Sequence, residues 1–77
     1  MQIIDITLKG KMDHVFRFEY LTKQPGMIET LEKNFKNLIA GSIRSFSVSS
    51  TKNDFIVLFT REIIQECIVI IKETTAN

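Results

Sequence analysis

The sequence predicts an α+β fold in which two ββα units build a four-stranded, mainly antiparallel sheet with two helices on one face. Three observations support this. Residues 27–40 place apolar side chains at helical spacing, the flanking segments alternate apolar and polar residues with a period of two, and short polar turns separate the alternating runs. At 77 residues the chain is expected to form a single small domain over residues 1–77.

Residues 2–9 and 14–21 are predicted to form a first β-hairpin. Both runs alternate, and the aromatic and β-branched content of the second run favours a strand. Residues 10–13 contain glycine and aspartate, which are typical of a turn. The side chains expected to face the helices are Ile4, Ile6, Leu8, Phe16, Phe18 and Tyr20.

Residues 27–40 are predicted to form an amphipathic helix. Six apolar side chains fall within one arc of roughly 120° at a rotation of about 100° per residue, with Pro25 expected at the first turn and Gly41 at the end. The acid-to-base pairs Glu29–Lys33 and Glu32–Lys36 have the favourable i to i+4 order. The apolar face consists of Met27, Ile28, Leu31, Phe35, Leu38 and Ile39.

The period of two returns after Gly41 and predicts a second hairpin. Phe46 and Val48 alternate with serines, and residues 51–54 have turn composition. Residues 55–59 are apolar at every position, so we expect either a central place in the sheet or a second face that is covered by something else.

Residues 62–73 allow two interpretations. As a helix, Ile63, Ile64, Cys67, Ile70 and Ile71 form one stripe, and charged residues recur at helical spacing. As a fifth strand, the run from residue 67 to residue 71 has strong β-propensity. The spacing of the charges favours the helix, and a fifth strand is the alternative.

The composition limits the possible functions. The chain is 44% hydrophobic and 25% charged, which is ordinary for a globular protein, and it contains one cysteine and no apolar run long enough to span a membrane. The first residues lack the basic start of a signal peptide, so a cytoplasmic location is expected. Abundant Ile, Lys, Asn and Phe suit an AT-rich genome, such as that of a phage or mobile element.

The residue types that carry chemistry are sparse. His14 is the single histidine and is expected at the start of a strand, and Cys67 is the single cysteine and is expected on an apolar stripe. There is no metal-ligand spacing and no glycine-rich phosphate loop. The sequence therefore predicts no catalytic, metal or cofactor-binding residue, and we do not expect an enzyme.

Apolar residues on the sheet face away from the helices predict an interaction surface. The expected function is a small regulatory protein–protein interaction module, a homodimer or a partner of another protein. These interface residues are Ile3, Val15, Leu21, Ile56 and Leu58.

The alternative function is a nucleic-acid-binding accessory protein that uses basic residues of the same sheet face. The net charge of +1 and the isoelectric point near 7.9 are low for a strong nucleic-acid binder. The residues that would contact phosphates are Lys9, Lys11, Arg17, Arg44 and Lys52.

Overall fold

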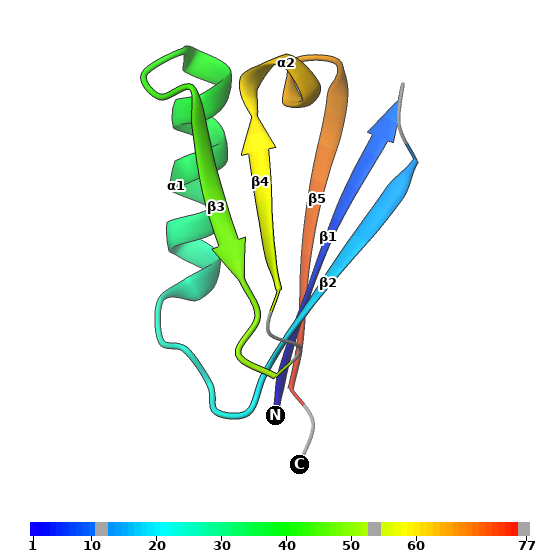
Figure 1. Cartoon of the computed structure of the whole chain (residues 1–77), viewed down its shortest axis with the longest axis vertical. Helices are drawn as coiled ribbons and strands as arrows, with labels where there is room; N and C mark the ends of the chain where they lie inside the picture. The colour runs from blue at the N-terminus through cyan, green and yellow to red at the C-terminus, as the bar shows by residue number, and fades with distance from the viewer. Residues whose placement is uncertain (11–12, 53–54, 76–77) are drawn as a thin grey trace.

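The computed structural model describes residues 1–10, 13–52 and 55–75, and shows an α+β protein with two antiparallel sheets (Figure 1). A three-stranded sheet has the order β2-β1-β5, and a separate hairpin pairs β3 with β4. The elements are β1 (Gln2–Gly10), β2 (His14–Tyr20), α1 (Met27–Ala40), β3 (Ser45–Ser49), β4 (Ile56–Thr60), α2 (Arg61–Ile64) and β5 (Cys67–Thr75).

The central strand of the larger sheet is β1, which pairs with β2 on one edge and with β5 on the other. The predicted first hairpin is confirmed, with Ile4 opposite Phe18 and Ile6 opposite Phe16. Because side chains alternate along a strand, the even-numbered residues from Gln2 to Leu8 face the core and are buried, while the odd-numbered ones face outward.

Helix α1 has the predicted bounds and most of the predicted buried face, but Ile39 of that face is 55% exposed. Leu31, Phe35 and Leu38 are buried at i, i+4 and i+7, so the helix is held mainly by the burial of one stripe. Gly26 precedes the helix as its N-cap, which places Pro25 just outside the first turn. Gly41 ends the helix in the left-handed conformation, as the sequence predicted.

Gly41→Ala should destabilise the protein by about 1–2 kcal/mol, because an L-residue is strained at a φ of 86°. The new Cβ would also lie 3.3 Å from the Arg61 guanidinium. Urea unfolding followed by circular dichroism measures this loss. Gly26→Ala is the matched control: Gly26 also has a positive φ, of 72°, but has no atom within 4 Å of the new Cβ. An equal loss of stability in both variants would show that the close contact with Arg61 contributes nothing to the effect of Gly41→Ala.

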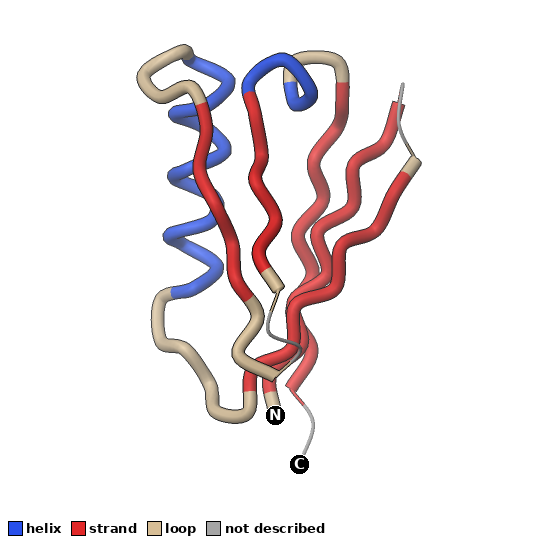
Figure 2. The backbone as a smooth tube through the Cα atoms, in the orientation of Figure 1, coloured by secondary structure: helices blue, strands red, loops and turns tan. Residues whose placement is uncertain are grey.

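The second predicted hairpin forms, but the prediction of one four-stranded sheet is wrong. The structure has a three-stranded and a two-stranded sheet, and Figure 2 shows β3 and β4 as a pair apart from the other strands. The hairpin forms no strand ladder with the larger sheet and packs against it mainly through side chains. Phe59 contacts Phe16, and Phe55 stacks on Phe18.

The expected central place of residues 55–59 is corrected for the same reason. Strand β4 pairs with β3 alone, so it is an edge strand of a two-stranded sheet and not a central strand. Phe59 is buried on the inner face, whereas Ile56 and Leu58 on the outer face are 72% and 58% exposed. The unbroken apolar run therefore belongs to a strand that has one buried face and one exposed apolar face. Sequence periodicity alone does not distinguish such a strand from one that is buried on both faces.

The predicted helix over residues 62–73 is also wrong, and the alternative of a fifth strand is correct. Residues 61–64 form only one helical turn, α2, and β5 pairs with β1 from Cys67 opposite Gly10 to Thr75 opposite Gln2. The β-branched run of β5 completes the second edge of β1, and this nine-residue ladder outweighs the helical spacing of a few charges.

Candidate interaction surface

The outer face of the β2-β1-β5 sheet is open and carries apolar side chains. Directly opposite residues share a face, so Val15 of β2, Thr7 of β1 and Ile70 of β5 form one row across the three strands. Ile68 lies beside Lys9 in the next row towards α2. Val15, Ile68 and Ile70 are 53%, 67% and 45% exposed. We call this surface the outer face below.

A row of alternating charges crosses the same face. Asp5 of β1 lies directly opposite Arg17 on one side and Lys72 on the other. Arg17 donates two hydrogen bonds to the Asp5 carboxylate, from Nε at 2.8 Å and from Nη2 at 3.0 Å. These bonds, together with the positive charges of Arg17 and Lys72, lower the pKa of Asp5 from its ordinary value. The last side chain of the row is the positively charged Lys72 of β5.

The free edge of β2 is covered near its end by the segment that follows β3. Ser50 Oγ donates to the Glu19 carbonyl at 2.8 Å, and the Lys52 N–H donates to the same carbonyl at 3.1 Å. Tyr20 Oη donates to the Ser49 carbonyl at 2.6 Å, and burial raises the pKa of this phenol. These bonds attach the hairpin to the larger sheet and protect this edge from further strand pairing.

Gln2 joins three parts of the chain, and the sequence analysis assigned it no role. Its side chain is fully buried. Its Oε1 accepts the Gln24 N–H at 2.8 Å, just before α1, and its Nε2 donates to the Glu73 carboxylate of β5. The only indication of this role in the sequence is the position of Gln2, a polar residue that falls on the same face of the strand as the buried Ile4 and Ile6.

The structure places the predicted interface residues on separate surfaces. Ile3, which is half-buried, and Val15 lie on the outer face of the larger sheet. Ile56 and Leu58 lie on the outer face of the β3–β4 hairpin, and Leu21 is exposed in the bend after β2. The sequence analysis missed Ile68 and Ile70, because it treated their segment as a helix.

The predicted phosphate-contacting residues do not form one cluster. Arg17 is paired with Asp5, and Lys52 Nζ lies 3.7 Å from a Glu19 carboxylate oxygen. Lys9 is on the outer face, and Arg44 directly precedes β3. Lys11 lies outside the described residues. Carboxylates thus neutralise two of the five basic side chains.

His14 and Cys67 are the first residues of strands β2 and β5. His14 begins β2 and packs its ring edge-on against Phe16, with the ring centroids 4.3 Å apart. Cys67 begins β5 and is half-buried. Within residues 1–10, 13–52 and 55–75, no group of three His, Cys, Asp or Glu side chains could hold a metal ion.

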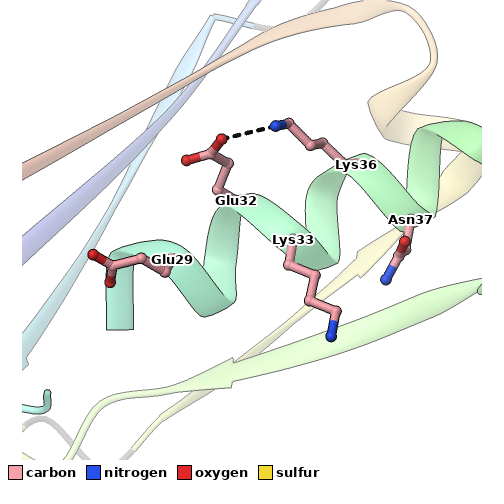
Figure 3. Close-up of a pocket in the computed structure, with 5 residues that line it drawn as sticks. All are labelled: Glu29, Glu32, Lys33, Lys36 and Asn37. Carbon is pink, nitrogen blue, oxygen red and sulfur yellow. Dashed lines mark ion pairs between the residues drawn. The ribbon is translucent and has the colours of Figure 1, made fainter. Parts of the chain in front are cut away.

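A shallow depression lies on the exposed side of α1 and is lined by charged side chains (Figure 3). Lys36 Nζ lies 2.9 Å from Glu32 Oε1, so one of the two predicted i to i+4 pairs forms, while Lys33 points away from Glu29. The bond and the charge of Lys36 lower the pKa of Glu32. The four charged side chains of this depression all belong to exposed residues of the helix.

A second groove runs between the N-terminal half of α1 and β3. Tyr20 lines this groove, and its hydroxyl donates a hydrogen bond to the Ser49 carbonyl. The walls are mixed in polarity and carry no ionisable group other than Tyr20. The lining residues are Tyr20, Gln24, Met27, Thr30, Leu31, Asn34, Ser47, Val48, Ser49 and Thr51.

The fold and the surfaces define the chain as a small α+β protein with an open, partly apolar sheet face. No protein-family model, curated protein or solved structure matches the sequence or the fold. Among the described helices, none has the length and apolar character needed to cross a membrane.

Proposed function

We propose that this protein is a small, non-enzymatic protein–protein interaction module that self-associates. The observation that supports the proposal is the outer face of the β2-β1-β5 sheet, where the row of Val15, Thr7 and Ile70 is left uncovered by the described chain. Exposed apolar side chains that gather on one sheet face are typical of interaction sites. The outer side of the hairpin, with Ile56 and Leu58, offers a second surface for another partner.

The proposed setting is the cytoplasm, and the composition favours an accessory protein of a phage or mobile element. In this proposal, a module of this size acts through what it binds. Its regulatory effect would come from covering or bringing together partner surfaces.

The solution mass tests self-association. We expect size-exclusion chromatography with light scattering to give twice the chain mass of 8.9 kDa at high concentration. The mass should fall towards 8.9 kDa on dilution, because interfaces of limited area dissociate readily. A mass of one chain at the highest soluble concentration would reject self-association.

The alternative, nucleic-acid binding, has less support because Arg17 and Lys52 are paired with carboxylates. A gel shift with DNA and RNA at low salt separates the two proposals. A phosphate-directed complex should form there and weaken steeply as salt is added, whereas an interaction module should leave both nucleic acids unshifted.

A further inference from the structure

We propose that a second copy of this chain pairs with the free edge of β5, giving a continuous six-stranded sheet β2-β1-β5-β5-β1-β2. This inference rests on the proposed self-association and specifies its surface and register. Strand β5 is nine residues long and pairs with β1 alone in the described chain. Its unpaired edge offers backbone donors and acceptors to another strand.

Other edges of the fold are less suited to this pairing. The segment after β3 already bonds to β2 at Glu19. Strands β3 and β4 have only five residues each, and α1 lies alongside β3 (Figure 1). Edge strands are usually protected by charges or covering segments, whereas β5 begins with five uncharged residues and presents Ile68 and Ile70 to solvent.

The sequence of β5 selects one antiparallel register. With Val69 opposite Val69 of the second copy, Ile68 lies opposite Ile70 twice on the outer face, and Cys67 lies opposite Ile71 on the inner face. Every pair within residues 67–71 is then apolar with apolar. Such pairs stabilise a sheet by about 0.2–1 kcal/mol each.

The charges of the outer face agree with the same register. It places Lys72 opposite Glu66 of the second copy, next to the existing row of Arg17, Asp5 and Lys72. The row then alternates in sign across three strands and ends on the Glu66 carboxylate, which belongs to the turn just before β5 of the second copy. Glu66 lies close to the end of β1 within its own chain. A Cβ added at Gly10, the last residue of β1, would lie only 3.0 Å from the Glu66 carbonyl oxygen.

Neighbouring registers lose this complementarity. Centring the pair on Ile70 places Cys67 opposite Glu73 and Ile68 opposite Lys72, and centring it on Lys72 places two lysines together. A shift by one residue would set inward-facing side chains opposite outward-facing ones. The two-fold arrangement also uses the same edge of both copies, so it closes as a dimer and does not continue as a filament.

Cysteine cross-linking in the full chain tests the register, in a background that carries Cys67→Ser. Directly opposite residues meet the Cα separation of a disulfide, whereas residues displaced diagonally by two positions are too far apart. Val69→Cys should therefore form a disulfide-linked dimer on mild oxidation. Ile68→Cys and Ile70→Cys should each remain mainly single chains when oxidised alone, but should cross-link to one another when mixed.

A second measurement uses charge instead of a cross-link. Ile70→Lys should reduce the mass in light scattering to that of one chain, because it places a lysine against Ile68 of the second copy. Ile39→Lys is the matched control: Ile39 is also an isoleucine and is 55% exposed, but it lies on α1 and not on β5. It should retain the dimer mass, and circular dichroism should show both variants folded.

The outcomes separate this inference from the proposed self-association. A wild-type dimer with the expected cross-links supports both. A wild-type dimer in which Val69→Cys does not cross-link, or in which Ile70→Lys keeps the dimer mass, overturns the β5 contact but leaves self-association through another surface. A wild-type chain that stays monomeric at every concentration overturns both.

Discussion

Phe59→Ala should destabilise the protein by about 3–5 kcal/mol, the largest effect expected for a single substitution here. The Phe59 ring is 2% exposed and contacts three other rings from three different elements. Its centroid lies 5.4 Å from Phe16 of β2, 5.2 Å from Phe35 of α1 and 5.5 Å from Phe46 of β3. The ring therefore joins the helix and both sheets, and its removal leaves a cavity where they meet.

The loss is large relative to the stability of the whole domain. A chain of 77 residues has about 4–12 kcal/mol of stability in total. Urea unfolding at 25 °C measures the change, and thermal unfolding should show a fall of about 4–8 °C for each kcal/mol lost.

Leu58→Ala is the matched control, because Leu58 is the adjacent residue of β4 and is 58% exposed. Its effect should stay within about 0.5 kcal/mol. If Phe59→Ala does not fold, Phe59→Leu keeps part of the volume and should show a smaller loss in the same direction. Equal unfolding midpoints for the wild type, Phe59→Leu and Leu58→Ala would contradict the central position of Phe59.

Gln2→Ala should cost about 2–4 kcal/mol, since it combines a cavity with the loss of two hydrogen bonds. The fully buried Gln2 side chain accepts from the Gln24 N–H and donates to Glu73. Without it, β1, β5 and the segment before α1 lose a common polar contact. Denaturant unfolding compares the variant with the wild type.

Gln2→Met separates the two contributions, because methionine keeps most of the volume but cannot replace the hydrogen bonds. We expect Gln2→Met to retain part of the loss, of about 1–3 kcal/mol. The exposed Gln65 provides the control, and Gln65→Ala should have little effect. A Gln2→Met variant as stable as the wild type would show that Gln2 contributes only by filling space.

The outer face illustrates how far a candidate site could be predicted from the sequence. Alternation in residues 14–21 was enough to place Val15 on the sheet face that points away from the core-facing phenylalanines, and the structure agrees. Ile68 and Ile70 could not be assigned to this face, because their position depends on pairing with β1 about sixty residues earlier in the chain. The role of Gln2 could not be predicted either, since its partners are distant in the chain. They are Gln24, which precedes α1, and Glu73 of β5.

Local patterns in the sequence determined helix α1, its Gly41 cap and the inward faces of both hairpins, because hydrophobic period and capping act over a few residues. The tertiary structure alone decided which strands become neighbours. Strand β1 has two edges, and β5 occupies the second because its β-branched run forms a nine-residue ladder there. For this reason the segment that the sequence predicted as a helix is a strand, and β3–β4 forms a separate hairpin. Strand partners are selected by competition between distant segments, which local patterns do not report.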